Sequence, residues 1–242
     1  MPASPSEIYR QQARFEAAYT VTEAARILRV SRTTLDYWAR GKFVNTEVGR
    51  IPTRDAMIDV ARMEKPCMLS FVNLLEAHVL KLITQEHGIK LPKVRDTLNF
   101  LKDKFGDEHP LVLRDFSISG EDLLFKESGM YMDRNEQLVM ERILKLYWKR
   151  VEYREDDPIA GAYFPLMHPG EVEGPKPIRI DPLIAFGNPV LNGTGYRTDM
   201  IAYRSWAGDS IELLAEEYAL EKDQIQQAID WEETQRSLRS AA

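Results

Sequence analysis

The stretch YTVTEAARILRVSRTTLDYWARG at residues 19–41 carries the signals for two short helices joined by a tight turn. Thr20 and Glu23 have the spacing of a capping box, in which each side chain bonds to the backbone of the other residue, so a helix is predicted to begin there. Ser31 is a favoured N-cap for a second helix. Residues 29–31 form the predicted turn between them. The pair has the pattern of a helix-turn-helix.

The second helix of this pair presents polar side chains at its N-terminal end. Leu35 and Trp38 have the spacing to point inward, which leaves the hydroxyl-rich start of the helix open. Helix-turn-helix proteins read base edges from this part of their second helix, while neighbouring side chains hold phosphates. We therefore predict base contacts from Arg32, Thr33, Thr34 and Tyr37, and phosphate contacts from Arg26, Arg40 and Lys42.

Local charge favours DNA binding at this end of the chain. The whole protein has a formal net charge of -6, yet residues 24–54 hold seven basic and two acidic residues. A basic patch that opposes the overall charge is what phosphate binding requires. Residues 41–52 fit a short hairpin wing beside the helices. The alternative, a plain two-helix core element with a solvated basic face, stays open on the sequence alone.

The middle of the chain has two strongly apolar helical segments. The first, residues 70–87, has apolar side chains at helical spacing, and His78 among them is predicted to be a hydrogen-bonded core residue. The second, residues 92–105, begins with proline in its first turn and stops at Gly106. Residues 81–105 hold six basic and three acidic residues. Two interpretations follow: a second helix-turn-helix, or a packing and dimerisation unit, which we favour.

The segments that follow contain turn signals and short helices. A hairpin is predicted at residues 111–129, and a helix with an extended end at residues 135–155. Three prolines and two glycines in residues 169–177 predict a linker. Three short helices are then predicted at residues 197–206, 210–218 and 222–232.

The C-terminal helices are strongly acidic. Residues 209–233 hold nine acidic residues and one basic residue, and such a surface repels phosphate. This module is therefore predicted to bind protein, either a second copy or a basic partner. The predicted partner contacts are Glu212, Glu216, Glu217 and Asp230.

Several classes of protein are disfavoured by composition. The single cysteine, Cys67, excludes an intramolecular disulfide and fits a reducing cytoplasm. No signal-peptide core and no apolar run of membrane-spanning length is present, so a cytoplasmic protein without membrane contact is expected. No metal-ligand or cofactor motif is found. We expect no enzyme activity, because no nucleophile motif or phosphate loop is present and catalytic spacing is lacking among the carboxylates Asp122, Asp156, Asp157 and Asp181.

These patterns together predict a mainly α fold with small β-hairpins (α+β). It comprises an N-terminal winged helix-turn-helix, a middle helical domain with a hairpin, and a C-terminal three-helix module. The predicted boundaries are 1–18 for a lead-in, 19–65 for the DNA-binding domain, 66–168 for the middle domain, 169–177 for the linker and 178–242 for the C-terminal module.

The opening stretch also carries a family resemblance. YTVTEAARILRVSRTTLDYW (residues 19–38) looks like the start of the winged helix-turn-helix of MerR-type and excisionase-type DNA-binding proteins. In those families a tyrosine-threonine entry, an alanine-rich first helix and a second helix of the pattern VS..TL.YW recur. The resemblance implies a DNA-binding domain with a wing.

A longer resemblance covers the C-terminal module. IRIDPLIAFGNPVLNGTGYRTDMIAYRSWAGDSIELLAEEYALEKDQIQQAIDW (residues 178–231) closely resembles the domain-of-unknown-function family 433. The family pattern is a strand with IDP, a G.PV..GT turn, and three helices containing AGDS. This sequence has Gly195 and Tyr196 where the family usually has arginine and an aliphatic residue, so no role for a basic side chain at that turn is carried over.

The two resemblances together imply a function. Members of family 433 are similar to VapB-type antitoxins, and a MerR-like start followed by LSFVNLLEAHVL (residues 69–80) and a family 433 module resembles their long form. This implies a type II antitoxin that neutralises a PIN-like ribonuclease toxin and represses its own operon through operator DNA, as a homodimer. The alternative is a stand-alone MerR-like transcriptional regulator without a toxin partner.

Overall fold

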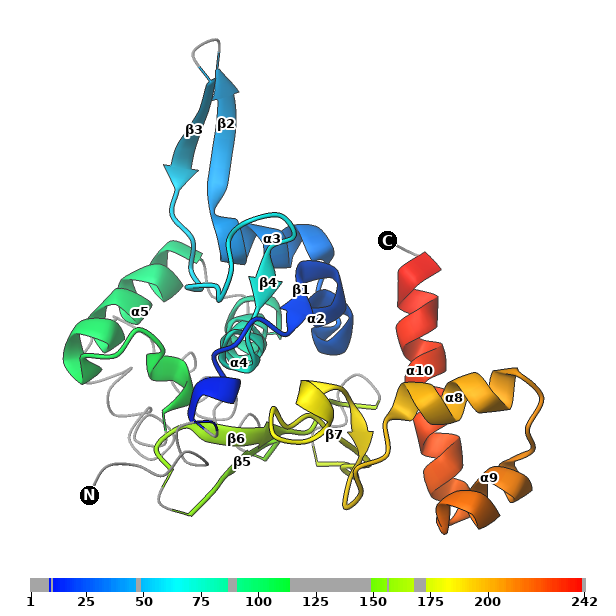
Figure 1. The fold of residues 1–242 in the computed structure, drawn as a ribbon. Helices are drawn as coiled ribbons and strands as arrows, with labels where there is room; N and C mark the ends of the chain where they lie inside the picture. Colours follow the sequence, from blue (N-terminus) through cyan, green and yellow to red (C-terminus); the bar gives the residue numbers. More distant parts are fainter. Residues whose placement is uncertain are drawn as a thin grey trace.

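The computed structural model describes residues 9, 11–46, 49–86, 91–113, 149–155, 157–167 and 173–240, and it shows a mixed α+β fold (Figure 1). The helices of these parts are α2 (Val21–Leu28), α3 (Arg32–Arg40), α4 (Phe71–Lys81), α5 (Leu91–Phe105), α8 (Thr198–Trp206), α9 (Ile211–Tyr218) and α10 (Lys222–Ser240). The strands form small two-stranded antiparallel sheets. The predicted fold class is confirmed.

The N-terminal unit is a helix-turn-helix with a hairpin wing. Strand β1 (Tyr19–Thr20) pairs with β4 (Met68–Leu69), which closes the start of the unit onto its end. After α3, strands β2 (Lys42–Thr46) and β3 (Gly49–Arg54) pair as the hairpin. In Figure 1 this hairpin projects from the body of the protein beyond α3. The predicted wing is therefore confirmed, and its second strand runs slightly further than expected.

Helix α4 lies at the centre of the core. Every side chain from Phe71 to Leu80 is buried, including the polar ones. The predicted helix is confirmed, and its burial on every side goes beyond what the apolar spacing indicated. Asn73 explains how the polar side is accommodated: its side-chain oxygen accepts from the Ala61 and Ser70 amides at 3.0 Å each, and its amide nitrogen donates to the Asp59 carbonyl at 2.7 Å.

The rest of the middle region packs around α4. A π-helical turn (Leu82–Glu86) continues α4, and α5 follows with Val94, Leu98 and Leu101 buried. Because α4 has no described side chain open to solvent before Lys81, it packs as a core helix. The choice between a dimerisation unit and a second DNA-binding helix pair stays a prediction.

The predicted hairpin at 111–129 and helix at 135–155 fall mostly outside the described residues. At their edges, a 3-10 turn (Pro110–Val112) precedes Leu113, which bridges to Ile159. Strand β5 (Val151–Tyr153) pairs with β6 (Ala160–Tyr163). The extended end predicted for residues 135–155 is thus confirmed as β5.

The C-terminal module begins with a short sheet. Strand β7 (Ile178–Arg179) pairs with β8 (Val190–Leu191), and a 3-10 turn (Ala185–Gly187) lies between them. Ile180 also exchanges backbone hydrogen bonds with Tyr163 of β6, at 2.8 and 2.9 Å. The module's sheet is therefore joined to that of the middle region.

The three predicted C-terminal helices are present, and the last is longer than expected. Helix α10 runs to Ser240, because no glycine or proline interrupts residues 232–240. Helices α9 and α10 are joined by the same type of turn as α2 and α3: Ala219 and Arg29 both end a helix in the left-handed conformation, with φ of 52° and 54°. The C-terminal module therefore contains a second helix-turn-helix, and this one is acidic.

Buried side chains from all these parts belong to one continuous hydrophobic core. Helix α10 packs against α8 and reaches back to α2 of the N-terminal unit. The predicted domain boundaries stay a prediction. Within the described parts of the chain, no helix has both the length and the apolar character needed to cross a membrane.

Candidate functional site

The starts of α2 and α3 are each held in place by capping interactions. Thr20 Oγ1 accepts from the Glu23 amide at 3.2 Å, and Glu23 Oε2 accepts from the Thr20 amide at 2.8 Å. Ser31 Oγ accepts from the Thr34 amide at 3.0 Å. These bonds satisfy backbone donors that a helix start otherwise leaves open. Both predicted helix starts are confirmed.

Buried side chains fix the angle between α2 and α3. Ala24 and Ala25 are small and buried, which lets α3 cross α2 closely. Leu35 and Trp38 point into the core from α3, as predicted, and Val30 fills the turn. The exposed end of α3 is therefore carried on a rigid support, which a surface that reads base edges requires.

The predicted base-contacting residues lie together at the start of α3. Arg32 and Thr33 are exposed, while Thr34 and Tyr37 are half-buried. The hydroxyl groups of Thr33 and Thr34 lie 3.0 and 2.7 Å from Ser31 Oγ, so they also belong to the cap. Arg32 and Thr33 are thus the most accessible members of this group.

The predicted phosphate-contacting residues lie in different surroundings. Lys42 is exposed at the base of the wing. Arg40 forms an ion pair with Asp36 one turn earlier, at 2.8 Å, so part of its charge is neutralised within α3. Arg26 lines a cavity beside the C-terminal module. The structure brings Lys42 and Arg40 near the end of α3 and places Arg26 against α10.

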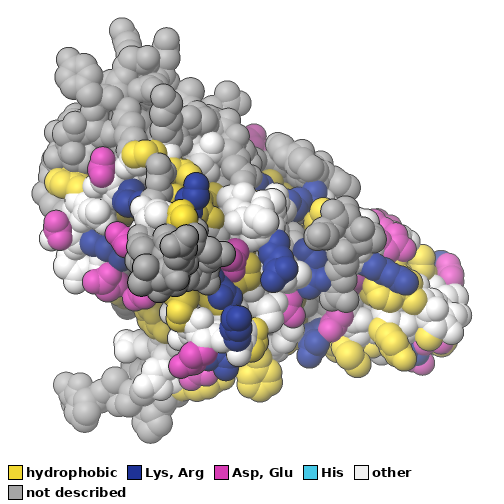
Figure 2. All heavy atoms as spheres, turned by 90° about the horizontal axis from the view of Figure 1, so that it is seen from above, with side chains coloured by type: hydrophobic (Ala, Val, Ile, Leu, Met, Phe, Trp, Pro, Cys, Tyr) yellow, Lys and Arg dark blue, Asp and Glu magenta, His cyan; other side chains and the backbone are white. Residues whose placement is uncertain are grey.

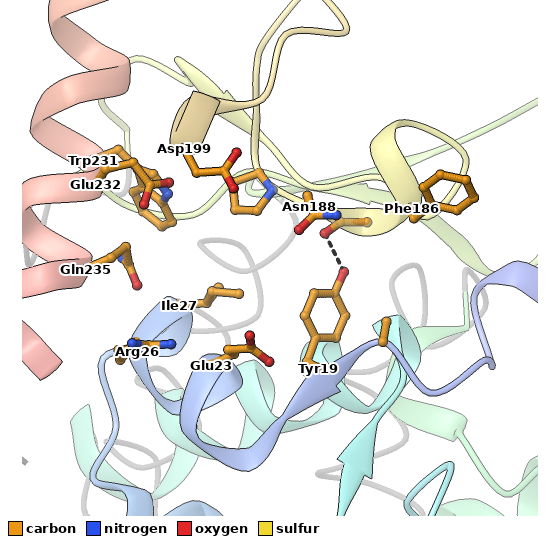
Figure 3. A pocket seen from close by; sticks show the side chains of 13 residues that line it. Tyr19, Glu23, Arg26, Ile27, Phe186, Asn188, Asp199, Trp231, Glu232 and Gln235 are labelled. Atoms are coloured by element: carbon orange, nitrogen blue, oxygen red, sulfur yellow. Dashed lines mark hydrogen bonds between the residues drawn. The ribbon is translucent and has the colours of Figure 1, made fainter. Parts of the chain in front are cut away.

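That cavity lies between α2 and the C-terminal module (Figure 3). Across it, side chains of α2 face those of α8 and α10, and the polar members are Glu23, Arg26, Asn188, Asp199, Glu232 and Gln235. At its edge the buried Tyr19 hydroxyl donates to the Gly187 carbonyl at 2.8 Å. Burial raises the pKa of Tyr19 well above its ordinary value, with smaller contributions from Asp181 and Glu23, so it stays a neutral donor.

The predicted partner-binding residues are all exposed on α9 and α10. Several of them already have partners within the chain. Glu212 pairs with Lys222 at 2.8 Å, and the Lys222 hydrogen bond lowers the Glu212 pKa. Glu217 pairs with Arg204, and Asp230 accepts from Gln226 at 2.7 Å. Internal cations therefore compensate part of the acidic surface, and Glu216 is left as an exposed carboxylate on α9.

Long-range polar contacts join the units, and sequence reasoning missed them. Arg14 is buried, and its guanidinium forms two hydrogen bonds with the Asp157 carboxylate, at 2.8 and 2.6 Å. Arg29, in the turn before α3, donates to the Met167 carbonyl. Asp181 accepts from Arg154 at 2.7 Å. No local pattern signals these pairs, because the partners are far apart in the sequence.

The described side chains that were candidates for catalysis or metal binding have structural roles. Cys67 is buried, and burial raises its pKa, which keeps the thiol protonated. His78 is a buried core residue that shares a hydrogen bond with the Tyr163 hydroxyl at 3.2 Å, as predicted. Asp157 and Asp181 are bound by arginines, while Asp122 and Asp156 lie outside the described residues. Within the ranges described above, no group of three His, Cys, Asp or Glu side chains is placed to hold a metal ion.

Comparison with known proteins gives relatives over most of the chain. The family described as "Protein of unknown function (DUF433)" matches residues 178–231. The chain is 25% identical over 230 residues to "Putative antitoxin VapB45" of Mycobacterium tuberculosis (strain ATCC 25618 / H37Rv), covering 88% of this chain and 92% of that protein. The chain resembles an antitoxin.

A solved structure has the same fold. The crystal structure of Rv2018 from Mycobacterium tuberculosis matches with a TM-score of 0.64 and 22% identity, covering 88% of this chain and 97% of that one. The match extends well beyond the C-terminal module, so the arrangement of the N-terminal and middle regions has a counterpart in a solved protein.

Proposed function

We propose that this protein is the antitoxin of a type II toxin–antitoxin system. It binds and neutralises a PIN-like ribonuclease toxin in the cytoplasm and represses its own operon by binding operator DNA. The observation that supports this best is the antitoxin similarity over 88% of the chain, together with an exposed α3 start beside a hairpin wing. A catalytic role, a metal and a cofactor are not part of the proposal.

The DNA-binding half of the proposal rests on the N-terminal unit. The start of α3 carries Arg32 and Thr33 into solvent, and Lys42 lies at the base of the wing. A helix in the major groove with a basic wing along the backbone would use these side chains for base and phosphate contacts, respectively. The proposed contact set is Arg32, Thr33, Thr34, Tyr37, Arg40 and Lys42. Arg26 is left out of it, because its side chain lines the cavity against α10.

A salt series of binding assays on the protein's own upstream DNA tests this half. Binding that weakens steeply with salt and changes when the product of the neighbouring gene is added supports an autoregulating antitoxin. Absence of binding at low salt would leave the helix pair as a core element and would end the repressor proposal.

Replacing Arg32 and Lys42 separately should distinguish base from phosphate contacts. Arg32→Ala is expected to lose about 1–3 kcal/mol of discrimination between operator and unrelated DNA, because a base-edge contact is removed. Lys42→Ala is expected to weaken both DNAs alike and to reduce the salt slope by about one phosphate contact. Competition assays with the two DNAs measure both effects. Equal behaviour of the two variants would contradict these roles.

The toxin-binding half rests on the acidic module. A PIN-like ribonuclease must bind RNA phosphates, so a carboxylate-rich surface fits its basic groove. The proposed contacts are Glu212, Glu216, Glu217 and Asp230. Of these, Glu216 is the best to alter, because replacing Glu217 would also break its pair with Arg204.

Glu216→Lys is expected to weaken toxin binding about tenfold or more, since it places a like charge against a basic surface. The measurement is titration calorimetry with the purified neighbouring gene product. Glu16→Lys, which makes the same charge change at an exposed position outside the module, is the matched control and should bind normally. Unchanged binding by Glu216→Lys would move the toxin site away from this surface.

A stand-alone MerR-like regulator remains the second candidate. It is favoured by the internal pairing of the acidic surface, because Arg204 binds Asp209 at 2.7 Å as well as Glu217, and Lys222 binds Glu212. A surface compensated in this way has less need of a basic partner. A toxin-sized gene beside this one, and co-purification of its product, would favour the antitoxin.

A further inference from the structure

Helix α8 exposes a strip of large apolar side chains. Met200, Tyr203 and Trp206 are 54%, 70% and 43% exposed, and they follow one another at intervals of three residues. Residues at this spacing share one face of a helix. Figure 2 shows hydrophobic side chains gathered at the end of the molecule that the C-terminal helices form, with charged side chains beside them. Tyrosine, tryptophan and methionine in such a cluster are typical of the centre of protein interfaces.

The strip is one wall of a groove whose other wall is α10. The groove lies where α8 packs against α10, and Glu232 and Arg236 line it from the α10 side. Figure 1 shows α8 crossing α10 at the side of the molecule opposite α5. A flat strip alone would be weak support for a docking site, but a groove gives a partner two surfaces to contact.

Charge is distributed unevenly along this groove. Asp199 and Glu232 lie at the end next to the cavity against α2, since both side chains also line that cavity. Arg236 lies at the opposite end, with its guanidinium 5.2 Å from the centre of the Trp206 ring. The groove therefore has the Asp199 and Glu232 carboxylates at one end, where Arg197 offsets part of the charge of Asp199, aromatic side chains in the middle, and Arg236 at the other end.

A surface with this polarity is complementary to itself. A two-fold rotation about an axis through Tyr203 places the acidic end of one groove opposite the basic end of the other. Asp199 and Glu232 of each copy then face Arg236 of the other copy, and the two aromatic strips pack together in the middle. A two-fold interface requires this kind of match, because the same patch is used by both subunits.

We propose that the α8–α10 groove is the dimerisation surface of this protein, occupied by the same groove of a second copy. The proposal goes beyond the antitoxin function and does not depend on it, because it requires only contact between two identical chains. If the DNA-binding proposal also holds, the dimer supplies the two helix-turn-helix units that a two-fold operator needs.

The first test concerns the apolar strip. Tyr203→Ser removes the most exposed ring of the strip, and the dissociation constant of the dimer is expected to rise about tenfold or more. Sedimentation velocity over a micromolar concentration series measures this change. The control is Leu213→Ser, which removes a 40% exposed apolar side chain from α9 outside the groove and should dimerise as the unaltered protein does.

The second test uses charge and distinguishes contact between copies from damage within one copy. Asp199→Arg and Arg236→Asp each place like charges together at both ends of the two-fold interface, so each variant alone is expected to be mainly monomeric. In an equimolar mixture, one chain of each kind restores an opposite pair at both ends. The mixture is therefore expected to form a heterodimer.

The mixing result cannot arise from a folding defect. Asp199 also pairs with Arg197 at 2.5 Å within its own chain, and adding a second chain does not repair that loss. Circular dichroism of each variant confirms that the helices remain. Recovery of the dimer on mixing, and its weakening by salt, support the proposal.

Three outcomes would overturn it. One is an unaltered protein that is monomeric throughout the concentration series. Another is a dimer that Tyr203→Ser and both charge variants leave intact, which would place the interface elsewhere. The last is a monomer whose Tyr203→Ser variant loses binding to the neighbouring gene product, which would assign the groove to that partner. Operator binding is scored separately, so failure of the DNA-binding proposal leaves the dimer result unaffected.

Discussion

Replacing Asp157 by alanine is expected to lower the free energy of unfolding by about 3–5 kcal/mol, because it leaves a buried guanidinium without its carboxylate. The Arg14 side chain is 1% exposed and that of Asp157 is 21% exposed, and the closest contact between their charged atoms is 2.6 Å. Among the described residues, the Arg14 guanidinium would keep its bond to the Ile159 carbonyl, at 3.2 Å, in this variant. An unpaired buried charge is among the most destabilising changes that a single substitution makes.

Urea unfolding followed by circular dichroism measures this loss. The double variant Arg14→Met, Asp157→Leu should recover much of it, since removing both charges leaves no unpaired group. Glu212→Ala breaks an exposed ion pair with Lys222 and serves as the control, with an expected cost of about 1 kcal/mol or less. A loss from Asp157→Ala no greater than that of the control would show that Arg14 finds water or another acceptor.

The Arg14 pair also has a pH dependence. Burial opposes ionisation of Asp157, but the hydrogen bonds from Arg14 and the Ile159 amide, with the Arg14 charge, outweigh it and lower the Asp157 pKa. Stability from a carboxyl whose folded pKa is lowered is present above its ordinary pKa and is lost as pH falls through the folded value. This contribution should therefore begin to fall only below the ordinary aspartate pKa of about 4.

As pH falls, protonation linked to His78 is expected to destabilise the protein at a higher pH than loss of the Arg14–Asp157 pair does. Burial, with smaller effects of the Lys81 and Arg150 charges, lowers the pKa of His78 from 6.5 to about 3. Between these values the unfolded chain binds a proton that the folded protein excludes, so stability falls as pH drops below 6.5. From neutral pH to pH 4, this single group should remove about 3 kcal/mol of unfolding free energy, at about 1.4 kcal/mol for each unit of pKa difference.

A comparison with His78→Asn isolates this effect. Asparagine keeps a hydrogen-bonding atom close to the position of Nδ1, which the Tyr163 hydroxyl contacts at 3.2 Å, but it does not titrate. Unfolding free energies of the two proteins, measured at neutral pH and in steps down to pH 4, should converge as pH falls. Parallel pH profiles would mean that His78 takes up its proton in the folded state.

His109 acts in the opposite direction, and the comparison with His78→Asn removes its contribution. Burial alone would lower the pKa of His109, but the hydrogen bond to Glu76 at 3.1 Å and the charge of Glu76 outweigh burial and raise it. Stability from this pair is complete below the ordinary histidine pKa and is lost as pH rises through the folded value. The unaltered protein and the His78→Asn variant share the contribution of His109, so it cancels in the difference between their unfolding free energies.

Local signals explain why the helix-turn-helix and its wing could be predicted. The capping box of Thr20 and Glu23 and the cap at Ser31 involve residues three apart, so their spacing is visible in the sequence. The same is true of the start of α9 at Ser210. Periodic spacing located α4 and α5, but it could not show that α4 is buried on every side. That depends on the partners of Asn73, which lie on other segments.

The contacts that join the units had no comparable signal. Arg14 and Asp157 are separated by 143 residues, and Tyr19 and Gly187 by 168. Charge counts also gave an incomplete account of the acidic module. They could not show that Arg204, on α8, compensates Asp209 and Glu217. The local shape of each candidate site was therefore accessible from sequence, while its surroundings required the folded chain.

The bond between Tyr19 and Gly187 has a consequence for dissecting this protein into fragments. Tyr19 is the first residue of β1, so the N-terminal unit begins with a side chain whose hydroxyl is bonded to the C-terminal module. Any chain cut before residue 178 leaves that hydroxyl without its acceptor and uncovers the face of α2 that α10 shields. Gly187 has no room for a larger residue here, since an added Cβ would lie 2.5 Å from the Tyr19 oxygen. DNA affinities measured on an isolated N-terminal fragment would therefore describe a unit that has lost its bond to Gly187 and its contact with α10. Only the intact chain reports how the two ends of the protein influence each other.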